Sequence, residues 1–486
     1  MKIKNWACCF FIAFVVVTLC SFSTSWLFGK PLMHDSAVFQ VIGKNWVEGI
    51  IPYKDLWELK GPIIFLFNAL GYYMFSSKFG VYVIQIFCMT CTLYFILKMF
   101  LVEFTSKTSI LLTCLSAFYL SVLYEAGNCV EEYLMPLLTY AFYLLYRYVN
   151  KCVDSKEYDL PHFYAFSFGC VLGFSLMSRL TNAISICAAV IVIGVTLIIY
   201  KKIWNLIWSI LYFIFGFLLL TIPFFVYFYL KDALAEMWYG TFLFGLEYAS
   251  SSGFDLFSFF GLRHVSLRLA NCYLLIIVSI LAIRYNPQRI FPALMWLTVS
   301  LLTIAVFLQL RPFGHYYIIT IPFVPVIFIE LNKLMKVNKI VGKFNFVKCV
   351  VYVYVLLGTL GIVNNVKNYY TVFSDYNELD VFERIVNRLP HDFRSSFVAY
   401  DCDTEFYLYF DIPPKYKYFY CQSLMINEGA SIKKRIEECF HSGNVKYLVV
   451  YGYPELLKET IKSRYTFMFS QKSTRGGIYN VYLQKK

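Results

Sequence analysis

Segments of about 20 mainly apolar residues recur through the first 366 residues, and a segment of that length can cross a bilayer as a helix. Eleven such segments are found, at residues 6–28, 80–100, 108–124, 134–150, 163–179, 182–200, 206–230, 265–283, 291–310, 316–333 and 347–365. The chain is 59% hydrophobic and 15% charged, whereas soluble domains average roughly 45–50% and about 25%. The sequence therefore predicts an all-α polytopic membrane protein with about 11 transmembrane helices. It excludes a cytosolic enzyme, a secreted disulfide scaffold and a disordered regulator.

The basic residues indicate how these helices are oriented. Alternate loops carry pairs of Lys and Arg, at residues 98 and 107, 147 and 151, 201 and 202, and 284 and 289. The positive-inside rule assigns such loops to the cytoplasm. Eleven crossings then place the N-terminus in the cytoplasm and the C-terminus on the extracytoplasmic side of the cell (inner or plasma) membrane. This distribution also accounts for the net charge of +13, so we expect no nucleic-acid partner.

One further apolar stretch, Gly61 to Phe75, affects this count. It has 15 residues, which is short for a span, and counting it would place the later basic loops outside. We interpret it as a juxtamembrane helix at the outer surface, near the end of a long first outer loop at residues 29–79.

The chain changes character after residue 366. Charged and polar residues return, and short apolar runs predict strands at residues 396–400, 446–451 and 478–483, with a helix at 432–440. We therefore expect two domains, a transmembrane domain at residues 1–366 and a small extracytoplasmic α/β domain at residues 367–486.

Two ionisable residues in the first outer loop suggest chemistry, because charges near the membrane are costly unless they are paired. Asp35 directly follows the first span and suits a general base that takes a proton from an acceptor hydroxyl or amine. The alternative role is helix capping together with Ser36. Lys60 directly precedes the short apolar stretch, and its ammonium suits a lipid-linked phosphate. The alternative for Lys60 is snorkelling to ordinary lipid phosphates.

Three carboxylates lie close together in the second outer loop, at Glu125, Glu131 and Glu132. They suit coordination of a divalent cation, contact with the acceptor, or mutual raising of their pKa values. A solvated loop is the alternative, and the identity of any metal stays open.

Cations also gather at the predicted outer helix ends, against the positive-inside bias. They are Arg179, Arg263, Arg268, Arg311 and His315. Together they suit an anion site for a phosphate or pyrophosphate, while each alone is equally typical of a helix anchor.

Aromatic residues make up 20% of the chain. Those in the predicted outer loops suit stacking on sugar rings, and they are Trp46, Tyr53, Trp57, Trp238 and Tyr239. Core packing and the interfacial aromatic belt are the alternatives. No P-loop or dinucleotide-binding glycine fingerprint is present, which argues against a nucleotide-fuelled pump.

These features resemble the GT-C membrane glycosyltransferases, in particular the protein O-mannosyltransferase and aminoarabinose transferase branch called family 39. Members carry an Asp after the first helix, then a Phe-Glu-Lys-Pro-Pro-like stretch, and an acidic residue in the second outer loop. Here Asp35 matches the first feature, residues 57–62 (Trp-Glu-Leu-Lys-Gly-Pro) the second, and Glu131 or Glu132 the third. The match departs from the pattern through the inserted Leu59 and through a Gly in place of a Pro.

The resemblance implies a GT-C-like catalytic domain that moves a sugar from a polyprenyl-phosphate donor to an extracytoplasmic lipid, glycan or protein acceptor, as in cell-envelope glycan biosynthesis. The transfer would invert the configuration at the anomeric carbon of the sugar, with Asp35 deprotonating the acceptor. Lys60 would neutralise the departing phosphate, assisted by one or more of Arg263, Arg268 and Arg311. Residues expected near the acceptor, the sugar or a metal are His34, Tyr53, Trp57, Glu58, Glu131, Glu132 and His315.

Three other functions fit the same features. A transporter or flippase of lipid-linked sugars favours midplane charges and inverted repeats, which the sequence does not display. A polysaccharide polymerase or ligase would use similar outer cations but has no need of the Glu-x-Lys-Gly-Pro stretch. A non-catalytic GT-C scaffold that binds glycans is the third.

Overall fold

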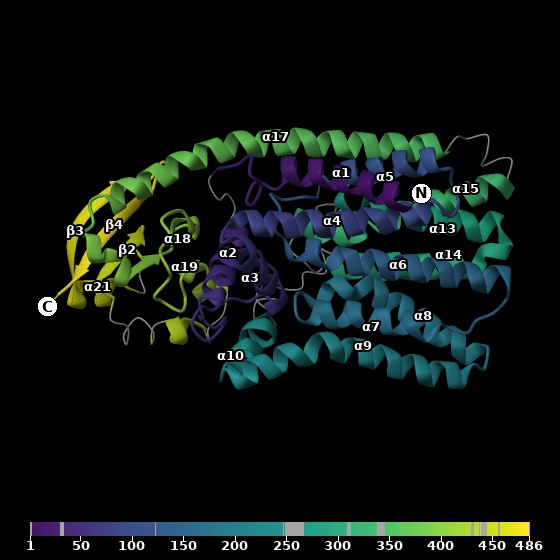
Figure 1. The fold of residues 1–486 in the computed structure, drawn as a ribbon, viewed down its shortest axis with the longest axis horizontal. Coiled ribbons are helices and arrows are strands. Elements are labelled where there is room, and N and C mark those ends of the chain that lie inside the picture. Colours follow the sequence, from purple (N-terminus) through teal and green to yellow (C-terminus); the bar gives the residue numbers. More distant parts are fainter. Residues whose placement is uncertain are drawn as a thin grey trace. The chain divides into compact units, whose positions relative to one another are not determined.

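The computed structural model describes residues 2–29, 34–121, 123–245, 247, 267–308, 313–337, 346–428, 432–436, 438, 445–454 and 457–485. The chain forms two compact units (Figure 1). The helical unit comprises Met1–Ser21, Tyr82–Phe224 and Asp255–Asn365. The mixed unit comprises Phe22–Val81, Phe225–Phe254 and Val366–Lys486. The boundary at Val366 falls inside a helix, and two earlier segments group with the C-terminal residues.

Each of the eleven predicted spans overlaps a helix. These helices are α1 (Lys2–Cys20), α4 (Lys78–Phe100), α5 (Ser106–Leu120), α6 (Val130–Asp154), α7 (His162–Leu176), α8 (Ile184–Ile199), α9 (Ile203–Leu230), α13 (Ala270–Tyr285), α14 (Ile290–Phe307), α15 (Phe323–Val337) and α17 (Phe346–Val386). Within the described residues, five helical segments are long and apolar enough to cross a membrane, or six if one bent pair counts as a single span. The number of eleven crossings therefore stays a prediction.

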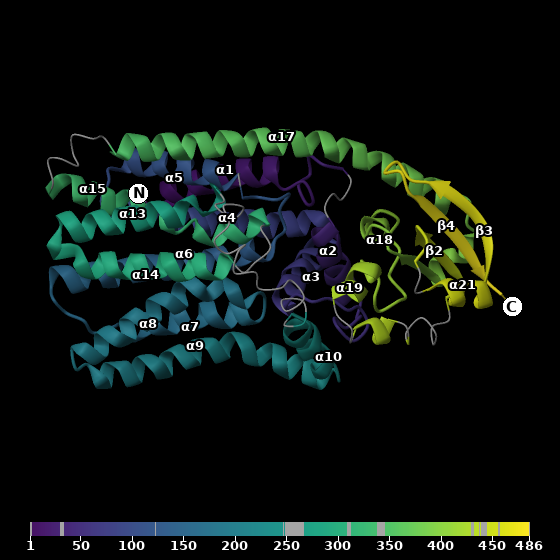
Figure 2. The ribbon, with the colours of Figure 1, turned by 180° about the vertical axis from the view of Figure 1, so that it is seen from behind.

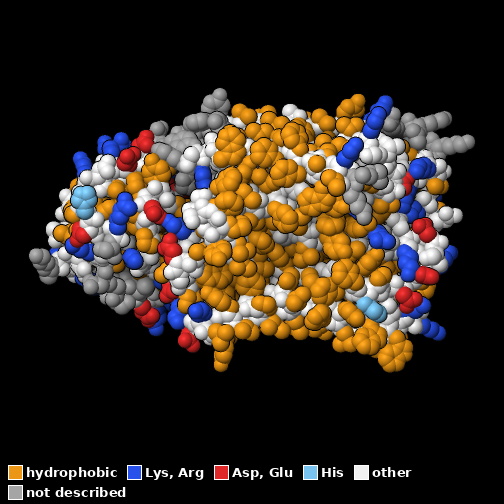
Figure 3. Space-filling view, in the orientation of Figure 1, with side chains coloured by type: hydrophobic (Ala, Val, Ile, Leu, Met, Phe, Trp, Pro, Cys, Tyr) orange, Lys and Arg blue, Asp and Glu red, His pale blue; other side chains and the backbone are white. Residues whose placement is uncertain are grey.

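The surface of the helical unit explains its composition. Figure 3 shows apolar side chains covering the exposed flank of the helices, with charged side chains gathered at the right-hand helix ends. On α9, only 17% of the most apolar window is buried inside the protein, and large side chains such as Trp204, Phe215 and Leu219 are exposed. An exposed apolar surface of this extent suits contact with lipid, so the unit is that of a polytopic membrane protein.

Two predicted helix ends were wrong. The first span was expected to reach residue 28, but α1 ends at Cys20. Ser21, Ser23, Thr24 and Ser25 follow and are buried, and short hydroxyl side chains of this kind compete with the helix for backbone hydrogen bonds. The last span was expected to end at residue 365, but α17 continues to Val386. No Gly or Pro interrupts residues 362–389, so nothing in the sequence breaks the helix there.

Close packing in the helical unit depends on glycines of α7 and α9, which run side by side in Figures 1 and 2. A Cβ added at Gly169 of α7 would overlap the carbonyl oxygen of Phe213 on α9. A Cβ added at Gly216 of α9 would likewise overlap the carbonyl oxygen of Phe166. Small residues let helix backbones approach within a membrane, and here they are required on both helices.

The mixed unit contains short helices and a sheet. Its elements are α2 (His34–Val47), α3 (Pro62–Phe75), α10 (Leu234–Trp238), η2 (Tyr239–Leu243), η7 (His391–Ser395), β1 (Phe397–Tyr400), α18 (Glu405–Tyr409), α19 (Gln422–Glu428), β2 (Tyr447–Tyr451), α21 (Lys458–Arg464), β3 (Tyr465–Lys472) and β4 (Ile478–Gln484). The helix α3 begins with Pro62 at its first turn, a position where proline needs no backbone N–H partner. Its 14 residues are consistent with the predicted juxtamembrane helix.

The sheet has the strand order β1-β2-β4-β3. β1 and β2 pair in parallel, with Phe397 opposite Tyr447, and the other two pairs are antiparallel. The three predicted strands correspond to β1, β2 and β4, whereas β3 was missed. β3 is an edge strand with mostly exposed or half-buried side chains, so it lacks the apolar run that marked the others.

One hydrophobic core joins three separate segments of the mixed unit. Trp57 from the first loop, Tyr239 and Phe244 from the middle segment, and Val398 and Leu448 from the sheet all belong to it. The loop that precedes α3 is therefore anchored on the C-terminal α/β fold by burial of large aromatic rings.

The contact between α7 and α9 yields a first prediction. Gly169→Ala should lower the free energy of unfolding by about 1–3 kcal/mol, because the added methyl group forces the two backbones apart. Thermal unfolding of the protein in detergent measures the effect. Gly194→Ala on α8 is the matched control, since no atom lies within 4 Å of a Cβ at that position. Equal melting temperatures for the two variants would contradict the packing described here.

Candidate functional site

The loop between α2 and α3 carries Lys60, and it is tightly turned. The Tyr53 N–H donates to the carbonyl oxygen of Leu56 over 2.7 Å, and Tyr53 itself adopts a positive φ of 67°. The Asp55 carboxylate accepts a hydrogen bond from the N–H of Ile51 over 2.7 Å. These local bonds define the path of the chain just before residues 57–62.

Both backbone polar groups of Lys60 are held by side chains of its own loop. The Lys60 N–H donates to the Glu58 carboxylate, and the Tyr53 hydroxyl donates to the Lys60 carbonyl oxygen over 2.6 Å. The ammonium of Lys60 also favours the ionised form of Glu58. The backbone of Lys60, the predicted phosphate-binding residue, is therefore held at its N–H by Glu58 and at its carbonyl oxygen by Tyr53.

Glu58 is buried, with 4% of its surface exposed. Its second carboxylate oxygen accepts a hydrogen bond from the Tyr420 hydroxyl over 3.0 Å. Burial raises the pKa of Glu58 above its ordinary value, although the Lys60 ammonium and the two hydrogen bonds oppose the shift. The carboxylate is thus satisfied by one donor on each oxygen.

Two residues predicted to stack on sugar rings serve as structural anchors instead. Tyr53 is completely buried and Trp57 is 1% exposed. Trp57 packs against Tyr239, Phe244 and Tyr418 at ring-centroid distances of 5.0–6.4 Å. In this conformation neither ring is exposed to a ligand, so the prediction of sugar stacking is wrong for this state. Short loops next to a sheet use their largest apolar side chains for burial.

Asp35 lies in the first turn of α2 and is exposed. Among the described residues it makes no hydrogen bond or ion pair, and the side chain of its neighbour His34 lies outside them. The Asp35 charge adds to burial in raising the pKa of Glu58, so the two carboxylates of this unit lie close enough to influence each other. The structure therefore supports only that the Asp35 side chain is exposed.

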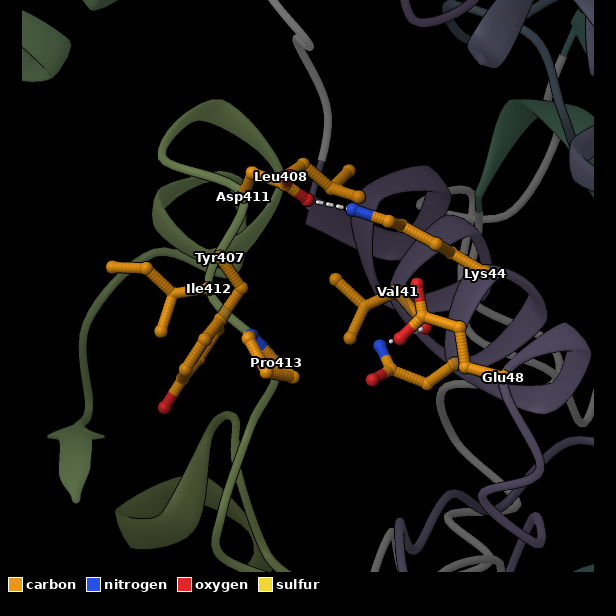
Figure 4. A pocket seen from close by; sticks show the side chains of 9 residues that line it. Val41, Lys44, Glu48, Tyr407, Leu408, Asp411, Ile412 and Pro413 are labelled. Atoms are coloured by element: carbon orange, nitrogen blue, oxygen red, sulfur yellow. Dashed lines mark hydrogen bonds and ion pairs between the residues drawn. The ribbon is translucent and has the colours of Figure 1, made fainter. Parts of the chain in front are cut away.

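A small cavity of about 180 Å³ lies between α2 and the segment that follows α18 (Figure 4). Lys44 and Asp411 form an ion pair across it. The remaining lining residues are Val41, Asn45, Glu48, Tyr407, Leu408, Ile412 and Pro413. The helix that carries Asp35 in its first turn is therefore tied to the C-terminal segment near its last turn.

In the helical unit, Glu125 collects a mixed set of partners. It accepts hydrogen bonds from the Gly314 N–H over 2.5 Å and shares one with Nδ1 of His315 over 2.8 Å. A guanidinium nitrogen of Arg268 lies 3.9 Å from the carboxylate. Burial alone would raise the pKa of Glu125, but His315, the Gly314 N–H and Arg268 together lower it. The structure thus brings together Glu125, Arg268 and His315, three of the residues singled out from the sequence.

Glu131 belongs to a different group. Its carboxylate lies 3.3 Å from the Asn182 amide nitrogen and 3.5 Å from the Arg179 guanidinium. The guanidinium also lies 3.1 Å from the centroid of the Tyr316 ring, a cation–π contact. Glu131 is 1% exposed, so this pair is a buried ionic contact.

Glu132 is enclosed by neutral donors. It accepts hydrogen bonds from the Cys129 N–H at 2.9 Å, the Tyr124 hydroxyl at 2.5 Å and the Gln85 amide at 2.7 Å. Adjacent helical residues point about 100° apart, which explains why Glu131 and Glu132 reach different partners. The three carboxylates do not converge, and the described residues contain no group of three or more metal-ligating side chains. The expected shared cation site is therefore not formed by Glu125, Glu131 and Glu132.

Two of the predicted cations, Arg263 and Arg311, lie outside the described residues. Tyr420, Asn182 and Gln85 were missed, because a neutral side chain far along the chain carries no sequence signal of its partner. Only the aromatic run at residues 416–420 marks the segment that holds Glu58.

The Glu125 cluster predicts a pH-dependent contribution to stability. Glu125→Gln should lower the free energy of unfolding by about 1–2 kcal/mol at pH 7, since hydrogen bonds to a charged group are lost. The pKa of Glu125 is lowered from its ordinary value of 4.5, so this contribution is present above about pH 4.5 and is lost as the pH falls through the folded-state pKa.

Thermal unfolding at pH 7 and pH 4 measures this difference. Glu157→Gln is the control, because Glu157 forms an exposed ion pair with Lys151 and should change stability little. A stability gap between wild type and Glu125→Gln that is unchanged at pH 4, or absent at pH 7, would rule out the ionised cluster.

The fold matches that of known structures over nearly its whole length. It is similar to the crystal structure of ArnT from Cupriavidus metallidurans bound to undecaprenyl phosphate, with a TM-score of 0.64 and 12% sequence identity over 98% of each chain. The apo ArnT structure gives a TM-score of 0.60 and 11% identity over 99% of this chain and 98% of that one. No protein-family model and no curated protein sequence matches the chain. The protein therefore has the GT-C fold seen in ArnT, and the resemblance first seen at Asp35 and residues 57–62 is confirmed at the level of fold.

Proposed function

We propose that this protein is a membrane glycosyltransferase that moves a sugar from a polyprenyl-phosphate donor to an acceptor on the extracytoplasmic side of the plasma membrane. The observation that carries the proposal is the fold, which is shared over 98% of the chain with an ArnT structure that holds undecaprenyl phosphate. The held backbone of Lys60 and the exposed Asp35 side chain support it. The acceptor is a hydroxyl or amine of a lipid, glycan or protein.

The proposed reaction is a single displacement at the anomeric carbon of the sugar. The acceptor oxygen or nitrogen forms a bond to this carbon while the bond to the phosphate oxygen breaks, and the configuration inverts. The acceptor proton passes to Asp35, and the electron pair of the broken bond leaves with the polyprenyl phosphate. No nucleotide sugar is consumed.

Stabilising the leaving phosphate is the main electrostatic task in such a transfer. The Lys60 ammonium is proposed for this role, since an ammonium forms short charge-assisted hydrogen bonds with phosphate oxygens. Arg263, Arg268 and Arg311 stay proposals from the sequence as assisting cations.

Asp35 is proposed as the general base. It lies exposed in the first turn of α2, where a carboxylate can accept a proton from an acceptor hydroxyl or amine. Asp35→Asn should lower turnover by about 10²–10⁴-fold, the usual range for a positioned general base, with donor binding largely kept. Release of free polyprenyl phosphate by protein in nanodiscs is the measurement.

Glu48→Gln is the matched control for Asp35→Asn, because Glu48 is an exposed carboxylate just beyond the other end of α2. Its turnover should equal that of wild type. Full turnover by Asp35→Asn would exclude Asp35 as the base. Binding of the intact sugar donor by wild type without release of polyprenyl phosphate, in the presence of hydroxyl and amine acceptors, would favour a flippase instead.

Lys60→Ala should raise the KM for the sugar donor by about 10–100-fold, because a hydrogen bond between charged groups contributes about 1.5–3 kcal/mol. Lys60→Arg should recover part of the loss. Lys54→Ala is the control in the same loop, since the Lys54 ammonium donates to the carbonyl oxygen of Lys231 over 2.9 Å and has no proposed role. Equal KM values for Lys60→Ala and wild type would remove Lys60 from the phosphate site.

A further inference from the structure

We propose that Tyr420 and Glu58 are positioning residues for Lys60, so that one function of the C-terminal α/β domain is to hold the donor-binding loop in shape. The part of this inference that concerns donor binding rests on the proposed function, because it assumes that Lys60 meets the donor phosphate. The part that concerns the loop rests on geometry alone. Neither Tyr420 nor Glu58 is assigned contact with substrate.

The Glu58 carboxylate is the link between the two ends of the chain. One oxygen accepts a hydrogen bond from the Lys60 N–H, and the other accepts one from the Tyr420 hydroxyl. Tyr420 lies 362 positions after Glu58 in the sequence. Glu58 is 4% exposed, so water does not readily replace a lost donor. Removing the Tyr420 hydroxyl leaves a buried carboxylate oxygen without this partner, which is costly in such surroundings. The carboxylate is then expected to turn toward solvent or take up a proton, and either change weakens its hold on Lys60.

A second tether joins the same two segments. The backbone N–H of Trp57 donates to the carbonyl oxygen of Lys417 over 2.9 Å. The centroid of the Trp57 ring lies 5.7 Å from that of the Tyr418 ring. Consecutive residues of the loop, Trp57 and Glu58, are therefore held by one short segment of the C-terminal domain. This double attachment defines both the position and the orientation of the chain just before Lys60.

The holding segment is itself fastened to the sheet. The buried Gln422 amide donates to the carbonyl oxygens of Tyr418 and Ala399, over 2.5 and 3.3 Å, and Ala399 lies in β1. The Gln422 carbonyl oxygen accepts the N–H of Asp401 over 2.9 Å. A continuous series of bonds thus runs from β1 through Gln422 and the 418–420 segment to Glu58, and from Glu58 to the backbone of Lys60.

Tyr416 provides a matched comparison for Tyr420. Its hydroxyl also makes a buried hydrogen bond, to the carbonyl oxygen of Ile436 over 3.0 Å, and its ring lies in the same core. That bond stays within the C-terminal domain and does not reach the Lys60 loop. Tyr416→Phe and Tyr420→Phe therefore each delete one hydroxyl of similar burial, and only the second deletion touches Glu58.

The first experiment is hydrogen exchange on the full-length protein in nanodiscs without sugar donor. In Tyr420→Phe, amide exchange in the peptide that spans residues 58–62 should become about tenfold faster, because the Glu58 carboxylate holds the Lys60 N–H less firmly. Tyr416→Phe should leave this peptide unchanged and affect residues near Ile436. Glu58→Gln serves as a second variant should Tyr420→Phe fail to fold. Equal exchange of residues 58–62 in the Tyr416 and Tyr420 variants would overturn the proposal.

The second experiment measures turnover of a polyprenyl-phosphate sugar by the same variants. Tyr420→Phe should raise the KM for the donor about three- to tenfold while kcat stays within about twofold, whereas Tyr416→Phe should change neither. Faster exchange in Tyr420→Phe with an unchanged KM would reject the role in donor binding. If wild type neither binds nor cleaves the donor, the proposed function fails, and the exchange data still decide whether the C-terminal domain holds the loop.

Discussion

The Glu58 carboxylate is buried in the mixed unit, and the shape of the Lys60 loop depends on how that charge is satisfied. An ionised carboxylate in apolar surroundings is destabilising by several kcal/mol unless hydrogen bonds or counter-charges compensate. Here the compensation comes from the Lys60 N–H, the Lys60 ammonium and the Tyr420 hydroxyl. The same donors that stabilise the charge therefore also determine where Lys60 lies.

In the helical unit, three carboxylates are each held by a different set of partners. Glu132 accepts hydrogen bonds from neutral donors, one oxygen of Glu131 contacts Arg179 and Asn182, and Glu125 is held by His315 and a backbone N–H. Of the three, Glu125 is the most exposed and carries the most polar and charged set of neighbours. Glu131 and Glu132 are buried, whereas Glu125 keeps a partly exposed carboxylate.

The helices were predictable from the sequence because a membrane helix is specified by local composition, and each apolar segment overlaps a helix. Asp35 and Lys60 were predictable as candidates because their charges stand out beside apolar segments. The end of α1 at Cys20 and the edge strand β3 were missed, since the first depends on a run of hydroxyl residues and the second has little apolar pattern. Tyr420 was not predictable, because its role is defined by a partner 362 residues away. The burial of Trp57 likewise depends on Tyr239 and Tyr418, which only the tertiary structure brings to it.

Lipid binding measured by native mass spectrometry tests whether the protein recognises the phosphate of a polyprenyl-phosphate lipid. Purified protein would be offered polyprenyl phosphate and the corresponding polyprenol, which has the same chain but no phosphate. We expect wild type to retain the phosphate form at much lower concentration than the polyprenol, and this preference to shrink strongly in Lys60→Ala. Equal retention of the two lipids by wild type would contradict recognition of the phosphate.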